Sequence, residues 1–334
     1  MILGGDVGGT NTRLAFFESQ DGRPVPLVIE IFPSKDYAGL EEILPQFVSQ
    51  HSYPVDAAAF GIAGPVRNGR SITPNLPWIV EASTLAATLG LERVELVNDL
   101  EANAHGISVL EDRDFAVLNS GDAAAGGNRV LISAGTGLGE AGLISGRDGY
   151  IPYASEGGHA DFAPRGETEI ELLRYLLKTF EHVSYERVLS GPGLRNVYMF
   201  FRDTGRADEP AWLAQEMEHG DPARVITEHA LNGSSPLCVL ALDLFVSIYG
   251  AEAGNLALKA MATGGVYVGG GIAPKILPKL KEPGFLEAFG AKGRLSKLLE
   301  AIPIRVILND KTALLGAGRL AILSQLQTRI AGAQ

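Results

Sequence analysis

Cysteine is nearly absent from this chain of 334 residues, in which Cys238 is the only one. A single cysteine excludes a disulfide framework within the chain and a zinc site built from several cysteines, and it fits a reducing compartment. Because Cys238 lies in an apolar helical stretch, we expect it to be a small buried side chain of a long helix.

Long hydrophobic runs are also missing, since no uninterrupted apolar stretch reaches the roughly 18 residues of a membrane span. The longest apolar region, 236–263, is interrupted by Asp243, Glu252 and Lys259. The beginning of the chain has neither the basic region nor the long apolar core of a secretory signal. We therefore expect a cytoplasmic protein without a membrane partner.

Basic residues are in the minority: 28 Lys and Arg stand against 39 Asp and Glu, which gives a formal net charge of −11. A chain this acidic is repelled by the phosphate backbone of nucleic acids and by anionic membranes. The composition predicts no nucleic-acid partner, and small ligands that are bound by local groups.

The length and the hydrophobic pattern predict two α/β domains. In the first third, short apolar runs alternate with helical patterns. The expected strands are 2–7, 13–18, 24–32, 56–63 and 93–97, and the expected helices are 36–50, 81–89 and 99–110. Further on, the expected strands are 115–118, several within 129–153, 264–269 and 304–308, and the expected helices are 167–181, 192–202, 211–218, 222–231, 236–261 and 311–327. We expect a small domain, 1–110 plus 311–334, to which the last helix returns, and a large domain, 111–310, with helical insertions.

Glycine is abundant, with 41 among the 334 residues, whereas the average usage of about 7% would give roughly 23. Two stretches, 3–15 and 131–143, share one form: an apolar strand, a Gly/Thr-rich turn and a second apolar strand. Successive backbone N–H groups in such turns can bind phosphates, and the carboxylate of Asp6 could hold the Mg²⁺ of a nucleotide. A plain hairpin is the alternative for either turn.

Two nucleotide-binding motifs are excluded. Gly137-x-Gly139-x-x-Gly142 matches the dinucleotide fingerprint, but that fingerprint needs a helix after the turn and the residues that follow predict a strand. No G-x-x-x-x-G-K-[ST] sequence occurs, which excludes a P-loop enzyme.

Three further segments have a chemical and a structural interpretation. Asp99 follows an apolar strand, and it is either a helix N-cap or a base that accepts a proton from a substrate hydroxyl. Glu156 and His159 flank two glycines, a pattern that fits a loop around a polyol better than a metal site, because no spaced histidine accompanies His159. The glycines of 264–271 leave room for a flat base, or they form a tight strand-to-helix turn. Glu186 alone would be a surface helix charge.

Taken together, these segments resemble the bacterial glucokinase family, ATP-dependent enzymes of the hexokinase and actin-like ATPase superfamily. The matching stretches are GDVGGTNTRLA, LVNDLEANAHGI, ISAGTGLGEAGL, SEGGHADFAP, ERVLSGPGL, GNLAL, GGVYVGGGIAPK and LLGAG. They span nearly the whole chain, and SEGGHADFAP and ERVLSGPG are the most specific. The cysteine-rich zinc motif of the neighbouring repressor/kinase group is absent.

The resemblance implies a two-domain actin-like ATPase (ribonuclease H-like) α/β fold with an interdomain cleft, and a homodimer. It implies glucose and ATP as substrates with Mg²⁺, and Asp99 as the general base for the glucose 6-hydroxyl. The sugar contacts that it implies are Asn98, Glu156, His159 and Glu186, with Asn75 as a further candidate. The nucleotide contacts that it implies are Gly5, Asp6, Val7, Gly8, Gly9 and Thr10 in one loop, Gly135, Thr136 and Gly137 in the other, and Gly269, Gly270 and Gly271 beside the adenosine.

Two alternatives to this function stay open. One is a kinase for another hexose, such as mannose, fructose or an N-acetylated hexosamine. The other is a non-catalytic sugar sensor, which would ordinarily carry a DNA-binding extension. The strand expected from Ile2 leaves no room for that extension, and the candidate base Asp99 is present.

Overall fold

The computed structural model describes residues 1–73, 76–122, 124–147 and 149–331, with side chains up to residue 327. The chain forms two compact units. Unit 1 is Met1–Asp112 together with the C-terminal segment from Asn309, and unit 2 is Arg113–Leu308. Each has its own sheet and its own hydrophobic core.

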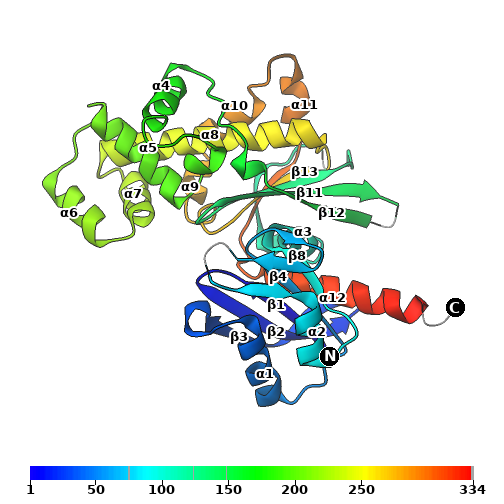
Figure 1. Cartoon of the computed structure of the whole chain (residues 1–334). Helices are drawn as coiled ribbons and strands as arrows, with labels where there is room; N and C mark the ends of the chain where they lie inside the picture. Colours follow the sequence, from blue (N-terminus) through cyan, green and yellow to red (C-terminus); the bar gives the residue numbers. More distant parts are fainter. Residues whose placement is uncertain (74–75, 123, 148, 332–334) are drawn as a thin grey trace. The chain divides into compact units, whose positions relative to one another are not determined.

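Unit 1 is built on a five-stranded sheet in the order β3-β2-β1-β4-β8 (Figure 1). Its strands are β1 (Ile2–Val7), β2 (Asn11–Gln20), β3 (Arg23–Pro33), β4 (Ala57–Ile62) and β8 (Glu95–Asn98). The first three strands pair antiparallel, whereas β4 and β8 continue the sheet parallel to β1. The helices are α1 (Leu40–His51), α2 (Ala82–Leu89), α3 (Asp99–Ile107) and α12 (Thr312–Ala331).

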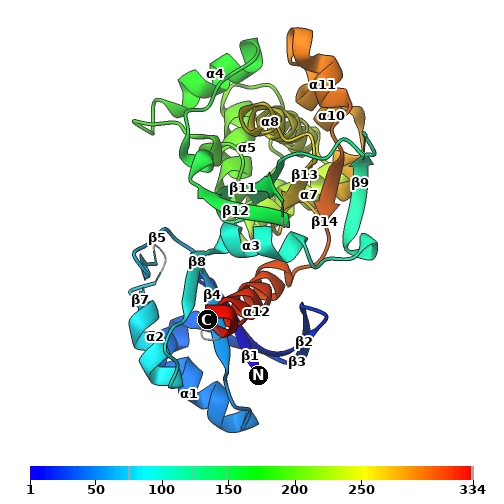
Figure 2. The ribbon, with the colours of Figure 1, turned by 90° about the vertical axis from the view of Figure 1, so that its right-hand side faces the viewer.

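Both faces of this sheet are covered, because apolar residues occupy successive positions of the strands. Leu3 and Phe60 belong to the cluster that α1 and α2 cover. Ile2 and Phe17 belong to the opposite cluster, which includes Leu314 of α12. The chain therefore returns at its end to complete unit 1, and Figure 2 shows α12 on the side of the sheet away from α1 and α2.

Two local features of unit 1 bear on the sequence predictions. The turn Asn68-Gly69 joins β5 (Val66–Arg67) to β6 (Arg70–Ile72), with both residues at positive φ, which is typical of an Asn-Gly hairpin. The helix expected over 36–50 begins later, at Leu40. The reason is the buried Ser34, whose N–H donates to the Thr10 carbonyl. This bond holds the residues before the helix in a short 3₁₀ turn, η1 (Ser34–Asp36).

Unit 2 has a six-stranded sheet in the order β12-β11-β10-β13-β14-β9. Its strands are β9 (Phe115–Asn119), β10 (Arg129–Ala134), β11 (Leu138–Gly146), β12 (Gly149–Ser155), β13 (Gly265–Gly269) and β14 (Ile304–Ile307). As in unit 1, an antiparallel hairpin, here β10–β11, is extended by parallel strands, β13 and β14. The two sequence stretches with the same Gly/Thr form thus occupy equivalent places in two similar sheets.

Helices fill the rest of unit 2. They are α4 (Glu167–Leu176), α5 (Gly191–Asp203), α6 (Ala211–His219), α7 (Pro222–Leu231), α8 (Pro236–Ala260), α9 (Leu277–Leu280), α10 (Pro283–Gly290) and α11 (Ser296–Glu300). In Figure 1, α8 runs along the sheet in yellow, and it packs against α5, α7, α10 and β10. Cys238 is buried in it, as predicted.

The helix α8 is the one helix of the described residues that is long and apolar enough to cross a membrane. However, 72% of its most apolar window is buried inside the protein. Its hydrophobic surface is therefore used by the core of unit 2, which is the usual reason for such a sequence in a globular protein.

Several short elements were not expected from the sequence: β7 (Ile79–Glu81), α9, α10 and α11. They are too short for a hydrophobic period to be recognised.

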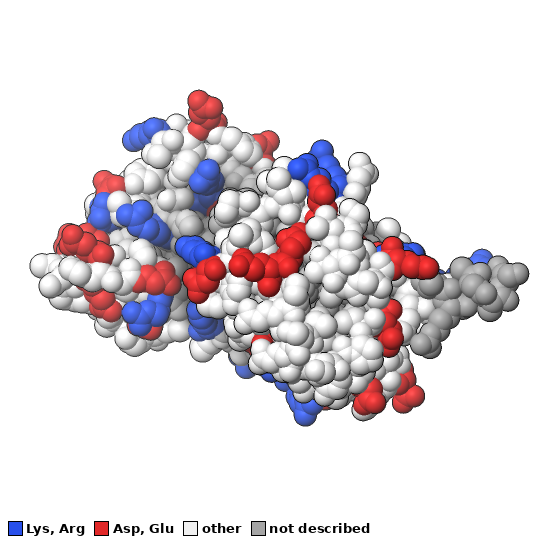
Figure 3. All heavy atoms as spheres, turned by 60° about the horizontal axis from the view of Figure 1, so that its bottom comes forward, with Lys and Arg blue, Asp and Glu red and all other residues white. Residues whose placement is uncertain are grey.

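Charged side chains of both signs lie on the face shown in Figure 3. On this face, the described Lys and Arg side chains do not form one continuous basic patch.

Candidate functional site

The first Gly/Thr turn joins β1 to β2 in unit 1. The N–H of Gly8 donates to the Asn11 carbonyl at 3.0 Å, and the Ser34 hydroxyl donates to the Gly8 carbonyl at 2.7 Å. These bonds fix the turn before any ligand binds. Of the predicted phosphate contacts, Gly5 and Val7 lie in the core, whereas the others reach the surface at least in part, namely Asp6, Gly8, Gly9 and Thr10.

Asp6 lies at the end of β1 with little positive charge around it. Its Oδ2 is 3.9 Å from Nη1 of Arg13, which is engaged by the carbonyl of Asp310 at 2.6 Å. Burial, opposed by Arg13 and assisted by Asp310, raises the pKa of Asp6 to about 6. A nearby cation would stabilise the ionised form of a carboxyl group whose pKa is raised in this way.

The surroundings of Asp6 fit Mg²⁺ that is held through a nucleotide. Among the residues that the structure describes, no three His, Cys, Asp or Glu side chains form a group that could hold a metal. Mg²⁺ in kinases is typically bound by one or two carboxylates together with water and substrate phosphates. Asp6 fits the role of such a single carboxylate.

Asn98 and Asp99 mark the point where β8 passes into α3. Asn98, not Asp99, is the N-cap: its Oδ1 accepts from the Glu101 N–H at 2.7 Å. Asp99 is the first helical residue, and its Oδ1 accepts from the Leu100 N–H at 2.9 Å. The helix start therefore holds the Asp99 carboxylate in a defined position.

The second Gly/Thr turn, residues 135–137, joins β10 to β11 in unit 2. Two residues of one later segment hold it. Oε2 of Glu186 accepts from the Leu138 N–H at 3.0 Å, and the Gly191 N–H donates to the Gly135 carbonyl at 2.8 Å. A Cβ on Gly137 would lie 2.5 Å from the same Glu186 oxygen. Glu186 is thus half-buried against the turn and is not the surface helix charge that its local sequence suggests.

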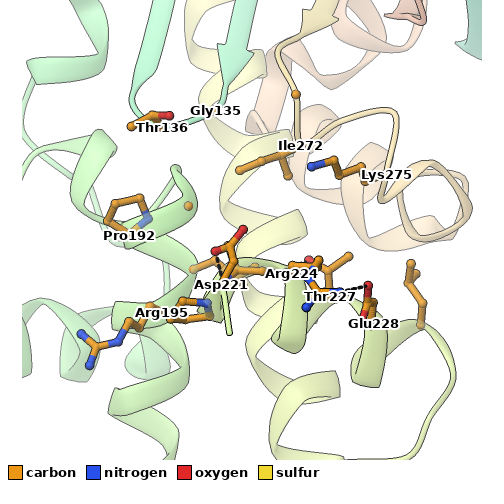
Figure 4. A pocket seen from close by; sticks show the side chains of 16 residues that line it. Gly135, Thr136, Pro192, Arg195, Asp221, Arg224, Thr227, Glu228, Ile272 and Lys275 are labelled. Atoms are coloured by element: carbon orange, nitrogen blue, oxygen red, sulfur yellow. Dashed lines mark hydrogen bonds and ion pairs between the residues drawn. The ribbon is translucent and has the colours of Figure 1, made fainter. Parts of the chain in front are cut away.

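A cavity of about 690 Å³ opens beside this turn, a size typical of small-molecule sites. Figure 4 shows Thr136 at one side, Pro192 and Arg195 from the start of α5, Asp221 at the N-cap of α7, and Arg224, Thr227 and Glu228 from α7 itself. Ile272 and Lys275 close the opposite side. Arg224 and Glu228 pair at 3.4 Å within α7, so that their charges partly offset one another.

The glycines predicted to lie beside adenosine have different roles. Gly271 lines the large cavity. Gly269 is the buried last residue of β13. Gly270 has φ +83°, and a Cβ there would overlap the Ala134 carbonyl. The backbone conformation and the close approach of Ala134 therefore require glycine at position 270, whereas Gly271 is the one of the three that faces the cavity.

A second cavity, of about 350 Å³, brings two predicted sugar contacts together: His159 and Glu186 both line it. His159 ends the short 3₁₀ turn η3 (Gly157–His159), and Glu186 lies in another, η4 (Tyr185–Arg187). Glu156 is exposed immediately before η3. Asn75 lies outside the residues that the structure describes.

Residues of α5 and α7 line the large cavity without any signal in the sequence, because their contribution depends on helix packing. Tyr249 was also missed. Its buried hydroxyl accepts from the Ala134 N–H at 3.2 Å and donates to the Gly269 carbonyl at 3.2 Å. It thereby ties the strand before one glycine turn to the strand before the other.

Comparisons with known proteins point in one direction. The family model described as Glucokinase matches residues 3–324. The chain is 41% identical to the glucokinase of Nostoc punctiforme, over 96% of this chain and 98% of the relative. It is similar to the crystal structure of a glucokinase from an Antarctic psychrotroph, with a TM-score of 0.82, 30% identity and coverage of 96% and 98% of the two chains.

A more distant neighbour shares the fold. It is a ROK family glucokinase from Streptomyces griseus in complex with glucose and AMPPNP, with a TM-score of 0.64 and 22% identity, and the match covers 96% of this chain and 98% of that one. The match of the family model to nearly the whole chain, together with the high identity to the Nostoc relative, identifies the family. This chain belongs to the glucokinase family.

Proposed function

We propose that this chain transfers the γ-phosphoryl group of ATP to the 6-hydroxyl of D-glucose, giving glucose 6-phosphate and ADP. One observation carries the proposal beyond family membership. The turn 135–137 is held on one side by Glu186, which lines the smaller cavity, and on the other by Gly191, which lines the larger cavity. A turn that presents backbone N–H groups between a sugar-sized site and a nucleotide-sized site suits phosphoryl transfer, which depends on positioning and charge stabilisation.

The sugar is proposed to bind in the smaller cavity. Glucose is neutral and rich in hydroxyl groups, so it is recognised by paired acceptors and donors. The carboxylate of Glu186 would accept from sugar hydroxyls, the imidazole of His159 would accept or donate, and Glu156 and Asn98 would add further contacts. Asn75 is retained as a candidate from the family resemblance.

The nucleotide is proposed to bind in the larger cavity, with its base between α7 and Gly271. The Streptomyces griseus protein of the same fold was crystallised with AMPPNP, which supports an adenine nucleotide here. The backbone N–H groups of both Gly/Thr turns would bind phosphates. Mg²⁺, when bound through Asp6, would neutralise charge on the phosphates during transfer.

Asp99 is proposed as the general base. Its place in the first turn of α3 fixes the carboxylate, and such a base accepts the hydroxyl proton as the phosphoryl group is transferred. We further propose that the two units are the domains of an actin-like ATPase fold. A homodimer in the cytoplasm is proposed from family membership.

A substrate panel tests the function. The purified chain is given ATP and Mg²⁺ with glucose, mannose, fructose or N-acetylglucosamine, and ADP release is followed with a coupled assay. We expect the highest kcat/KM with glucose, and little ADP release without sugar. A higher kcat/KM with another hexose would replace glucose as the substrate, and sugar binding without ADP release would indicate a sensor.

A further inference from the structure

The core of unit 2 holds two buried carboxyl groups that the proposed reaction does not use. Glu140 of β11 is 2% exposed, and Glu252 of α8 is fully buried. Within the described part of the chain, Oε1 of each side chain lacks a hydrogen-bond partner. Because an ionised carboxylate is costly to bury without full pairing, a site with two such groups is expected to keep one of them protonated.

Glu252 is the member of the pair that has partners for a negative charge. Its Oε2 accepts from Nδ2 of Asn255 at 2.8 Å, and Nζ of Lys259 lies 3.6 Å from its Oε1. The Tyr185 hydroxyl is a further hydrogen-bond partner of Glu252. Burial first, and the charge of Glu252 second, raise the pKa of Glu140 to about 7, although Lys259 opposes the shift. Burial and the neighbouring carboxyl group thus make Glu140 the side chain of the pair that gains a proton near neutral pH.

The other titratable groups around the pair do not neutralise Glu140. The Tyr249 hydroxyl stays protonated, because burial raises its pKa above the ordinary value. Lys292 faces Glu252, but its Nζ donates to Oδ1 of Asn255 at 2.5 Å. Burial and the charge of Arg165 lower the pKa of Lys292, whereas Glu252 raises it.

Glu140 also lies directly against one of the segments that line the sugar cavity. A Cβ added at Gly157 would overlap Oε2 of Glu140, so the carboxyl group packs on the first residue of η3. The Gly157 N–H is held by Oγ of Ser155 at 3.0 Å. Two residues further on is His159, which lines the cavity. On the other side of the pair, Tyr185 contacts Glu252 and directly precedes Glu186 in η4.

We infer that Glu140 is a positioning residue for sugar binding: as a neutral carboxyl group it supports the Gly157–His159 turn, and its ionisation loosens that turn and weakens glucose binding. The inference rests on the proposed function. A second negative charge next to Glu252 must attract water or move away, and the backbone of Gly157 is the atom group that it touches. The chemical step does not involve Glu140, so kcat is expected to change little.

The test is the pH dependence of the KM for glucose between pH 6 and 8.5, at saturating ATP and Mg²⁺. Glucose does not ionise in this range. If only the protonated form binds, a group with a pKa near 7 raises the KM about tenfold at pH 8. In Glu140→Gln, which keeps the shape but cannot ionise, we expect this rise to disappear. His159 is present in both proteins, so the difference between the two profiles isolates Glu140.

A second variant keeps the test valid if Glu140→Gln does not fold. Glu252→Gln removes the neighbouring charge and should move the rise in KM to lower pH, because Glu140 then ionises more easily. A KM that is independent of pH in the wild-type chain, or the same rise in Glu140→Gln, would overturn the inference. Absence of glucose phosphorylation in all three proteins would instead reject the proposed function.

Discussion

Replacing Asp99 by Asn separates catalysis from stability in this protein. The side-chain oxygen of Asn can still accept from the Leu100 N–H, which is 2.9 Å from Oδ1 of Asp99. The N-cap bond from the Glu101 N–H to Asn98 is not touched. What the substitution removes is the negative charge in the first turn of α3 and the ability to accept a proton.

These two losses differ in size. A first-turn carboxylate stabilises a helix by about 0.3–1 kcal/mol, which corresponds to a decrease in Tm of roughly 1–4 °C. Loss of a general base lowers kcat by about 10²–10⁴, or about 3–5 kcal/mol of activation free energy. We therefore expect Asp99→Asn to remain folded with a nearly normal Tm and to lose almost all glucose phosphorylation.

Glu101→Gln is the matched control. Glu101 is the other acidic residue of the first turn of α3, and it is not assigned to the site. Because burial raises the pKa of Glu101, loss of its charge should lower the Tm by no more than Asp99→Asn does, and it should leave kcat unchanged. The measurements are kcat in the coupled assay and thermal unfolding by circular dichroism. A kcat of Asp99→Asn within tenfold of the wild-type value would refute the role of Asp99, and equal losses in both variants would assign the effect to helix charge.

Three further outcomes are expected. Gly270→Ala should lower the free energy of unfolding by about 1–3 kcal/mol, because φ is +83° and the new Cβ would overlap the Ala134 carbonyl; Gly271→Ala, which meets no atom within 4 Å, should be neutral in the same urea titration. Glu186→Gln should mainly raise the KM for glucose, and an unchanged KM would remove Glu186 from the sugar site. Burial and a nearby Arg lower the pKa of His105 from 6.5 to about 4. The unfolded chain therefore binds this proton at a higher pH than the folded chain does. As the pH falls below about 6.5, the free energy of unfolding decreases, by roughly 2 kcal/mol at pH 5. Urea unfolding of His105→Gln should lack that decrease.

Much of the fold could be predicted because its signals are local. The strands around both Gly/Thr turns lie within a few residues of the expected positions, since each combines an apolar run with glycine at its end. The Asn68-Gly69 hairpin depends only on the conformational preferences of those two residues. Pro at the first or second helical position and Ser or Asp at the N-cap mark the starts of α5, α7 and α8.

The candidate site could be predicted only in part. Both Gly/Thr turns and the segments that carry His159 and Asp99 were recognised from sequence motifs. The walls that α5 and α7 give to the large cavity were not, and neither were the short helices that follow β13. Their sequences contain no functional motif, because they contribute to the site through their position against other elements.

The amino-acid sequence by itself determined the family, the α/β class and the duplicated strand–turn–strand motif, because these follow from residues close together in the chain. Only the tertiary structure decided which distant residues meet. It placed Glu186 against the turn at Gly137, and Gly191 against the carbonyl of Gly135. It also brought Glu140 next to Glu252, more than a hundred positions away. The physical reason is that contacts between distant side chains depend on how helices and sheets pack, and neither local propensity nor hydrophobic period contains that information.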